Sequence, residues 1–308
     1  MMIEAILDAC NDRFQMHNCS QCRSKCTYAK YCPGTCGRCL DYIHTPQHAP
    51  NGAPLRKYDC AHMADFYTCK YACRYTSEIV YAVERMRDLC QINNLRVLSF
   101  GCGPCTDLFA IDYLHEQDIL KYSSLEYRGI DYSKDVWDHI HSDIAKFERK
   151  NCKIEFLYND VCEVIKKIAC DSWVPNLIVF QYVFSDMKKH TDEEKINSFI
   201  DDFASYYNNA MEKNTYIILN DINLSIKYNG GREYFDELLQ KLDNSTSKKG
   251  RFCDNNATSC YYPRGYNYGE DSDGEFLQNK NRFDYQRWDF YQPFKTCASA
   301  QMIIKKEM

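Results

Sequence analysis

The chain has 308 residues, of which 45% are hydrophobic and 26% charged, a composition typical of soluble globular proteins. Its net charge of −5 excludes an overall basic surface of the kind that binds nucleic acid through phosphates. No apolar run approaches the roughly 20 residues that span a bilayer, and the acidic N-terminus is unlike a signal peptide. We therefore expect a cytoplasmic protein with no membrane partner.

In chain order, residues 1–15 predict a short amphipathic helix, residues 17–54 lack hydrophobic periodicity, and residues 58–92 are helical again. From residue 95 onward, short apolar runs alternate with longer amphipathic ones. The predicted strands are 96–100, 127–131, 153–158, 176–183, 216–220 and 300–305, and the predicted helices between them are 106–116, 133–150, 161–170, 192–211 and 231–242. Residues 244–293 are interpreted as long loops. The alternation predicts an α/β fold with a mainly parallel sheet covered by helices on both faces.

Cysteine is the unusual residue, since 19 are present and ten of them lie in the first 73 positions. In a reducing compartment, closely spaced cysteines bind metal more often than they form disulfides. Close pairs suit a tetrahedral zinc site, because a tight turn lets two sulfurs reach one ion. The predicted metal ligands are Cys19, Cys22, Cys26, Cys32, Cys36 and Cys39, and further candidates are Cys60, His62, Cys69 and Cys73.

Iron and sulfur are the alternative to zinc at these cysteines. The spacing Cys32-x3-Cys36-x2-Cys39 is that of radical S-adenosylmethionine enzymes, in which three thiolates hold a four-iron cluster. Such a motif follows the first strand of a barrel, whereas no predicted strand precedes Cys32. Zinc is therefore favoured, with an iron–sulfur cluster as the alternative. The predicted organisation is a Cys-rich metal-binding module over residues 1–57, a helical connector over 58–94 and an α/β domain over 95–308.

A glycine-rich turn follows the first predicted strand. Residues 97–108 read Val-Leu-Ser-Phe-Gly-Cys-Gly-Pro-Cys-Thr-Asp-Leu, which is a buried strand, a Gly-x-Gly turn and the start of a helix. Glycines there let the backbone turn sharply and approach a ligand at the carboxyl ends of the strands. The second strand ends in Asp131, where a carboxylate can accept hydrogen bonds from both hydroxyls of a ribose. The third ends in Asn159-Asp160-Val161, where an adenine amino group could be read.

These features resemble the class I S-adenosylmethionine-dependent methyltransferases, from about Leu95 to the C-terminus. The resemblance implies a Rossmann-like methyltransferase domain with S-adenosylmethionine as cofactor. The cofactor contacts that it implies are Gly101, Cys102, Gly103, Asp131, Tyr132, Asp160, Val161 and Gln181. A nicotinamide dinucleotide fold is the rival, but its fingerprint requires a third glycine where this chain has Thr106, and an acid about 20 residues on. Asp131 lies thirty residues beyond Gly101.

The methyl acceptor stays open between a small molecule, RNA and a protein. Residues 180–186 lack both the Asp/Asn-Pro-Pro-Tyr signature of enzymes that methylate exocyclic base amines and the Pro-Cys of cytosine C5 enzymes. Asp186, His190 and Asp221 are candidates for taking a proton, since each follows a predicted strand. Tyrosines are further candidates, for stacking on a planar substrate: Tyr261, Tyr262, Tyr266, Tyr268, Tyr285 and Tyr291, with Trp288.

Two readings of the whole chain compete with a zinc-bearing methyltransferase. One is a metal-organised binding or sensor protein that keeps the fold without methyl transfer. The other is an iron–sulfur or radical S-adenosylmethionine enzyme. A zinc module ahead of a class I methyltransferase domain is also similar in layout to some ribosomal-RNA guanine methyltransferases, which makes RNA one hypothesis for the partner.

Overall fold

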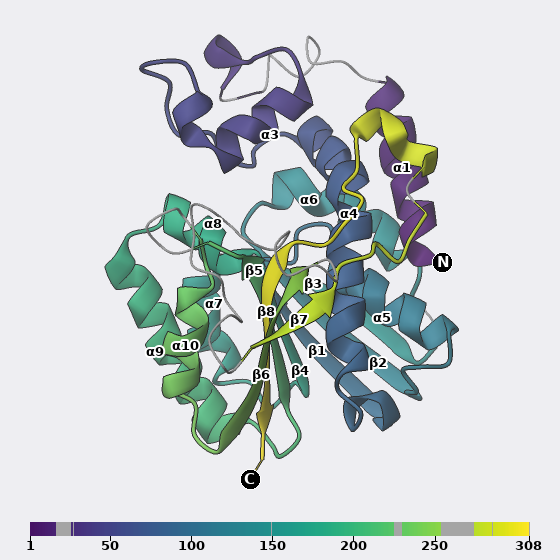
Figure 1. Ribbon diagram of the computed structural model, residues 1–308, viewed down its shortest axis with the longest axis vertical. Helices are drawn as coiled ribbons and strands as arrows, with labels where there is room; N and C mark the ends of the chain where they lie inside the picture. The colour runs from purple at the N-terminus through teal and green to yellow at the C-terminus, as the bar shows by residue number, and fades with distance from the viewer. Residues whose placement is uncertain are drawn as a thin grey trace.

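A computed structural model gives the structure of the chain and describes residues 1–16, 26, 28–148, 150–224, 230–253, 274–284 and 286–307. At its centre lies an eight-stranded sheet in the order β3-β2-β1-β4-β5-β8-β6-β7 (Figure 1). The strands are β1 (Asn94–Phe100), β2 (Ser124–Asp131), β3 (Cys152–Tyr158), β4 (Leu177–Gln181), β5 (Tyr216–Ile222), β6 (Ser245–Cys253), β7 (Gly274–Gln278) and β8 (Ser299–Lys306).

Strands β1 to β5 are mutually parallel, and β8 runs antiparallel between β5 and β6. The order β3-β2-β1-β4-β5 is that of a doubly wound sheet, in which the chain reverses direction across the sheet between β1 and β4. A ligand crevice is expected at the carboxyl ends of these two strands. The predicted α/β fold with a mainly parallel sheet is confirmed.

Two hydrophobic cores lie on opposite faces of the sheet, because successive side chains of each strand point to opposite faces. In β1, Leu95 and Val97 belong to one core, whereas Leu98 and Phe100 belong to the other. Residues of α1, α4, α5 and α6 cover the first face, and residues of α7, α8, α9 and α10 cover the second. Figure 1 shows the two groups on either side of the strands.

The predicted helices are all present in the predicted order, and two more, α3 and α8, were not predicted. They are α1 (Met2–Met16), α3 (Cys36–His44), α4 (Ala61–Glu84), α5 (Thr106–Glu116), α6 (Lys134–Ala145), α7 (Val161–Ile168), α8 (Val183–His190), α9 (Glu193–Ala210) and α10 (Glu233–Gln240). Short 3-10 turns are η1 (Ala29–Tyr31), η2 (Pro46–His48), η3 (Leu89–Gln91) and η6 (Gln286–Tyr291). None of the helices in the described ranges is long and apolar enough to cross a membrane.

The prediction of loops over residues 244–293 is wrong for β6, β7 and η6, whereas residues 254–273 and 285 of that range lie outside the described residues. The sequence of β6, Ser-Thr-Ser-Lys-Lys-Gly-Arg-Phe-Cys, has little apolar alternation, and its pairing comes from the backbone of β8. The helix α3 was not predicted either. Its nine residues include two cysteines and three charged or histidine side chains among few apolar ones, and it packs on α4 through Leu40 and Ile43.

Helix α1 is part of the main core. Its buried residues Met2, Ile3, Ile6, Leu7 and Cys10 join the cluster formed by α4, α5, α6 and the sheet. Residues 28–57, by contrast, form a small lobe of η1, α3 and η2 above α4 (Figure 1). The predicted division at residues 57 and 94 stays a prediction, but the buried residues of α1 pack with the sheet domain.

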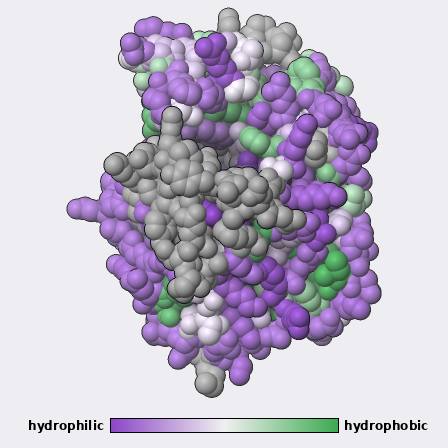
Figure 2. All heavy atoms as spheres, in the orientation of Figure 1, coloured by the Kyte–Doolittle hydropathy of each residue, from purple (hydrophilic) through white to green (hydrophobic). Residues whose placement is uncertain are grey.

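The face of the molecule seen in Figure 2 is mainly hydrophilic, with apolar residues only in small groups. Among the described residues the large exposed hydrophobic side chains are Met1, Met16, Leu55, Ile119, Tyr132, Phe290 and Phe294. Two of these, Tyr132 and Phe294, also line a cavity of about 670 Å³. The apolar surface that is exposed therefore lies partly at the mouth of that cavity.

Candidate functional site

A cavity of about 670 Å³ lies at the carboxyl ends of β1, β2, β3 and β4. Its floor comes from the residues that follow these strands, and its walls come from α4, α8 and the lobe of residues 28–57. This is the position at which a doubly wound sheet binds its ligand. Sites for single small molecules have volumes of roughly 300–1,000 Å³, so the cavity has the size of a small-molecule site.

The glycine turn after β1 is built around left-handed backbone. Gly101 and Gly103 have φ angles of +59° and +47°, which are strained for any residue with a Cβ. A Cβ on Gly101 would also come within 3.0 Å of the Val183 side chain. Both glycines line the cavity, so the turn leaves backbone exposed to whatever occupies it.

Asp131, at the end of β2, is held beside this turn by backbone donors. The Gly103 N–H donates to Oδ2 at 3.1 Å, and the Ser133 N–H donates to Oδ1 at 3.0 Å. Burial raises the pKa of the carboxyl, whereas these hydrogen bonds lower it. Each oxygen keeps a second lone pair, and Asp131 lines the cavity. The carboxylate can therefore accept two further hydrogen bonds from hydroxyl groups in the cavity.

The other predicted cofactor contacts divide into two groups. Tyr132, Asp160, Val161 and Gln181 line the cavity together with the glycines and Asp131, whereas Cys102 is not among the residues that line it. Their binding of a cofactor stays a prediction, but the structure brings all except Cys102 to one site.

Two of these side chains already have internal partners. Asp160 accepts from the Cys162 N–H at 2.9 Å as the N-cap of α7, and Lys195 Nζ donates to its other oxygen at 2.7 Å. Gln181 accepts a hydrogen bond from the Thr106 hydroxyl at 2.6 Å and donates to the Tyr75 carbonyl at 2.8 Å. These bonds fix both side chains at the edge of the cavity.

An aromatic wall on α4 was not predicted from the sequence. Tyr67, Tyr71 and Tyr75, four residues apart, line the cavity from one face of the helix. Their rings pack in series, with centroids 4.7 Å apart for Tyr67 and Tyr71 and 5.3 Å apart for Tyr71 and Tyr75, and Tyr182 follows at 4.2 Å from Tyr75. The only signal in the sequence was their four-residue spacing. It places the three tyrosines on one face of a helix but does not show what that face contacts.

His44 of the lobe lies between two tyrosine hydroxyls, that of Tyr71 in this wall and that of Tyr58, which precedes α4. Its Nε2 is 2.9 Å from the Tyr58 hydroxyl, and its Nδ1 is 3.2 Å from the Tyr71 hydroxyl. Burial, with a smaller effect of Lys189, lowers the pKa of His44 to about 3. Burial also raises the pKa of the Tyr58, Tyr67, Tyr75 and Tyr182 hydroxyls. These tyrosines and His44 are therefore uncharged and held by hydrogen bonds, and Arg74 of the same helix places a positive charge beside them in the cavity lining.

Glu78, one turn beyond Tyr75, joins α4 to the sheet. Its Oε2 accepts from the Tyr182 hydroxyl at 2.9 Å and from Asn220 Nδ2 at 2.8 Å, and its Oε1 accepts from Arg74 Nε at 3.2 Å and from the Ala298 N–H at 3.2 Å. The side chain is fully buried. Sequence reasoning missed it, because a glutamate in a helix usually faces solvent.

Of the three predicted proton acceptors, Asp186 and His190 line the cavity. His190 Nε2 lies 3.6 Å from Asp186 Oδ1, one helical turn away on α8. Burial raises the pKa of Asp186 to about 6. Burial, with the nearby Lys189 and Lys57, lowers the pKa of His190 to about 4. Near neutral pH the site therefore holds a neutral imidazole beside a carboxylate.

Asp221 is not among the residues that line the cavity. Its Oδ2 accepts from the Ser185 N–H at 3.0 Å and its Oδ1 accepts from the Ile222 N–H at 2.7 Å, and a Cβ added to Gly231 would come within 2.3 Å of Oδ2. Burial raises its pKa to about 6. These contacts satisfy the first turn of α8, which gives Asp221 a structural position.

The predicted N-terminal metal ligands are only partly visible, because Cys19 and Cys22 lie outside the described residues. Arg56, which is buried, donates from Nε to Cys39 Sγ at 3.4 Å and from Nη2 to Cys26 Sγ at 3.9 Å. Among the residues that the structure describes, these cysteines do not bring three ligand atoms within 4.8 Å of one another. Metal binding by this module stays a prediction.

The further candidate ligands lie in three places. Cys60 packs at the edge of the cluster that contains Cys36 and Cys39. The His62 ring stacks on Phe14 with centroids 4.2 Å apart. Cys69 and Cys73 are buried in the core between α4 and α1. The last two cysteines therefore belong to helix packing and not to the lobe.

A different group of ligand atoms lies directly behind the glycine turn. The Sγ atoms of Cys102 and Cys105 and a ring nitrogen of His141 all lie within 4.8 Å of one another, and the three residues are buried. Burial raises the pKa of Cys102. Burial also opposes ionisation of Cys105, but its hydrogen bond with Cys102 and the adjacent His141 lower its pKa to about 7. The sequence prediction placed Cys102 against the cofactor and did not single out His141.

The predicted stacking tyrosines add nothing to the described cavity. Tyr261, Tyr262, Tyr266, Tyr268 and Tyr285 lie outside the described residues. Tyr291 and Trp288 are buried in η6 against α1 and α4, where the Tyr291 hydroxyl donates to Asn11 Oδ1 at 3.0 Å. Of the two alternatives for these residues, stacking on a substrate and packing inside the protein, the structure shows packing.

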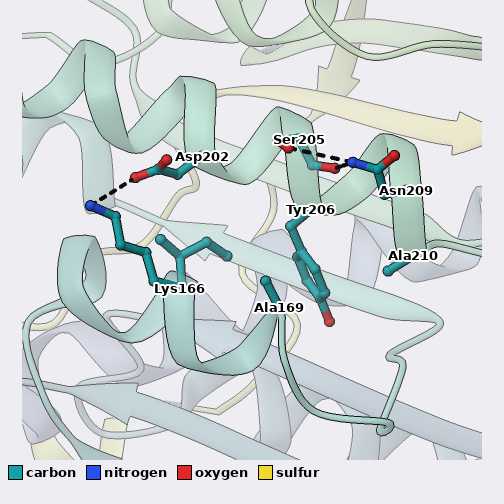
Figure 3. Close-up of a pocket in the computed structure, with 8 residues that line it drawn as sticks. Lys166, Ala169, Asp202, Ser205, Tyr206, Asn209 and Ala210 are labelled. Atoms are coloured by element: carbon teal, nitrogen blue, oxygen red, sulfur yellow. Dashed lines mark hydrogen bonds and ion pairs between the residues drawn. The ribbon is translucent and has the colours of Figure 1, made fainter.

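A second, smaller cavity of about 220 Å³ lies between α7 and α9 (Figure 3). Lys166 from α7 and Asp202 from α9 form an ion pair of 3.5 Å across it, and Asn209 Nδ2 donates to the Ser205 carbonyl at 2.8 Å. It contains none of the strand-end residues. We assign no chemistry to it.

No protein-family model matches the chain, and no curated protein matches it. Solved methyltransferase structures are similar at low identity. The plantazolicin methyltransferase BpumL in complex with SAH matches at 13% identity and a TM-score of 0.44, over 99% of this chain and 100% of that chain. A SAM-dependent methyltransferase from Archaeoglobus fulgidus matches at 16% identity and a TM-score of 0.40, over 75% and 94% respectively. At such values we infer the function from the site itself.

Proposed function

We propose that the protein is an S-adenosylmethionine-dependent methyltransferase whose acceptor is a small molecule with a planar ring. The observation that carries the proposal is Asp131, whose carboxylate is fixed beside the glycine turn and lines the cavity. A carboxylate in this position can accept hydrogen bonds from both hydroxyls of a ribose. Gly101 and Gly103 line the cavity in a left-handed backbone without a Cβ, so the residues present fit the cofactor.

The residues that would hold the cofactor are Gly101, Gly103, Asp131 and Tyr132, with Asp160, Val161 and Gln181 at the third and fourth strand ends. Bound S-adenosylmethionine supplies a methyl group activated by a positively charged sulfur. The residues of the chain orient the acceptor, exclude water and receive a proton from the methylated atom.

The tyrosine wall supports a planar acceptor. Tyr67, Tyr71, Tyr75 and Tyr182 present rings whose hydroxyls stay protonated because burial raises their pKa. Such rings stack on flat, uncharged groups. The cavity volume of about 670 Å³ also suits a small molecule better than a nucleic-acid strand. With 38 basic against 43 acidic residues, the chain lacks an excess of positive charge for RNA.

Asp186 and His190 are the residues that we propose to take the proton. The low pKa of His190 keeps its imidazole neutral at pH 7, so that a ring nitrogen can accept. Asp186, 3.6 Å from Nε2, stabilises the imidazolium that then forms. Lys189 lies near both groups and opposes a lasting positive charge on His190.

Calorimetric titration with S-adenosylmethionine tests the proposal. We expect wild-type protein to bind the cofactor and Asp131→Asn to bind it at least about 10-fold more weakly, because hydrogen bonds to a charged group contribute about 1.5–3 kcal/mol. Asp118→Asn, at an exposed carboxyl on another surface, is the matched control and should bind like the wild type. Absence of binding by the wild type, or equal affinity of Asp131→Asn, would falsify the proposal.

A zinc ion in the N-terminal module forms a separate part of the proposal. The buried Arg56 guanidinium donates to Cys39 Sγ and Cys26 Sγ and can balance the charge of thiolates there. We expect zinc in the purified protein, and its loss in a Cys32→Ser/Cys36→Ser variant. A brown protein with iron and labile sulfide would instead favour the iron–sulfur alternative. Metal content that is unchanged in the variant would exclude these cysteines as ligands.

A further inference from the structure

The strongest group of soft metal ligands in the described chain lies outside the N-terminal module. Cys102, Cys105 and His141 each turn one ligand atom toward the same point, with all three atoms within 4.8 Å of one another. The two cysteines lie in the turn between β1 and α5, and His141 lies on α6. All three side chains are almost completely buried.

The turn brings the two sulfurs to one side. The sequence is Cys-Gly-Pro-Cys, and the Cys105 N–H donates to the Cys102 carbonyl at 2.7 Å. Cys105 itself has a left-handed backbone, with φ of +63°, which is strained for a residue with a Cβ. A Cys-x2-Cys turn is the usual way for two thiolates to reach a single tetrahedral ion.

The histidine is placed and oriented as a third ligand. Its Nε2 lies 3.9 Å from Cys102 Sγ and 2.7 Å from the Gly103 carbonyl oxygen. In a tetrahedral zinc site with bonds of about 2.3 Å to sulfur and 2.0–2.1 Å to nitrogen, the sulfur-to-nitrogen distance is about 3.6 Å. The observed distance therefore needs only a small adjustment.

The other side of the ring is already fixed. His141 Nδ1 lies 2.9 Å from the Tyr158 hydroxyl, and the ring stacks on Phe156 with centroids 4.0 Å apart. The Tyr158 hydroxyl in turn lies 3.3 Å from Asp138 Oδ1 and can donate to it. A metal-binding histidine typically donates its second ring N–H to such an oxygen, which leaves Nε2 unprotonated for the ion.

We propose that Cys102, Cys105 and His141 bind one divalent ion of the zinc class. On binding, each thiol releases its proton to solvent, and His141 binds the ion through Nε2 without a proton there and keeps one proton on Nδ1. One doubly charged ion with two thiolates and a neutral imidazole has no net charge, which suits a buried site. The Gly103 carbonyl oxygen, 3.8 Å from Cys105 Sγ, is available as the fourth ligand once His141 no longer donates to it.

Such an ion would lie behind the candidate cofactor site. Gly103 takes part in both, because its N–H donates to Asp131 while its carbonyl faces the metal ligands. The ion would hold the glycine turn closed from the side away from the cavity. Metal binding does not depend on methyl transfer, so it is tested without any acceptor.

Cobalt titration of the full chain tests the site. All proteins carry serine in place of the six predicted N-terminal ligands, Cys19, Cys22, Cys26, Cys32, Cys36 and Cys39, and they are purified with a reductant, stripped with a chelator and titrated with Co²⁺. We expect one equivalent to bind with thiolate-to-cobalt absorption, and this equivalent to be lost when Cys102→Ser/Cys105→Ser is added. Cys170→Ser, at an exposed cysteine, is the matched control and should keep it. If the protein with Cys102→Ser/Cys105→Ser binds cobalt equally, the proposal is overturned.

A second measurement leaves Cys102, Cys105 and His141 unchanged, so that it does not depend on whether the Cys102→Ser/Cys105→Ser protein folds. X-ray absorption of zinc bound to the protein that lacks only the six N-terminal cysteines should show two sulfur neighbours together with nitrogen or oxygen. An all-sulfur shell, or no bound zinc, overturns the proposal. Reduced protein that binds no metal, but that loses two hydrogens in mass between Cys102 and Cys105 when treated with oxidised glutathione, would also overturn it and identify a thiol–disulfide pair.

Discussion

Glu78 joins the tyrosine-bearing helix α4 to the sheet, because each of its two carboxylate oxygens accepts two hydrogen bonds inside the protein. In Glu78→Gln, the amide NH₂ must face either Tyr182 and Asn220 or Arg74 and Ala298, and two donors then lose their acceptor. We expect the free energy of unfolding to fall by about 3 kcal/mol, as for a buried pair that loses one partner. Denaturant unfolding followed by circular dichroism measures the change.

Glu84→Gln on the same helix is the control for this substitution. Glu84 pairs with Arg282 at the surface, where ion pairs contribute at most about 1 kcal/mol. A loss in Glu78→Gln no larger than that in Glu84→Gln would show that Tyr182 and Arg74 do not depend on the buried carboxylate.

At the scale of single elements, the sequence predicted what local periodicity controls. The six predicted strands, 96–100, 127–131, 153–158, 176–183, 216–220 and 300–305, are all present. Five of them bury apolar residues on both faces of the sheet, and the edge strand β3 buries Ile154 and packs the half-buried Phe156 and Leu157 against the two cores. Strand β6 was missed, since its polar sequence pairs through the backbone with β8. A pattern of side chains cannot report such pairing.

The candidate site was predictable to the same extent. Gly101, Asp131 and Gln181 come together because the carboxyl ends of neighbouring parallel strands meet at one edge of the sheet. Tyr67 and Tyr71 were missed as wall residues because their role depends on how α4 lies over those strand ends and under His44. That arrangement is tertiary, and no local spacing encodes it.

Helix α1 gives an element-scale prediction. Leu7 is fully buried between α1 and the main core, whereas Met16 at the end of the same helix is 75% exposed. We expect Leu7→Ala to lower the free energy of unfolding by about 2–5 kcal/mol, because it removes buried methyl groups and leaves a cavity. Met16→Ala should change it by no more than about 0.5 kcal/mol. Equal effects of the two substitutions in denaturant unfolding would mean that α1 is not docked as described.

For the whole molecule, Asp221 predicts how stability depends on pH. Burial raises its pKa to about 6, from about 3.9 in an unfolded chain. The folded protein therefore binds this proton more tightly, so its contribution to stability is present below pH 4 and is lost as pH rises to 6. The loss corresponds to about 3 kcal/mol.

The free energy of unfolding of wild type minus that of Asp221→Asn should fall by this amount between pH 4 and pH 7, measured by denaturant unfolding at each pH. The same difference taken with Asp118→Asn, an exposed carboxyl, should stay nearly constant. A constant difference for Asp221→Asn as well would mean that the carboxylate stays ionised at the start of α8 throughout this range.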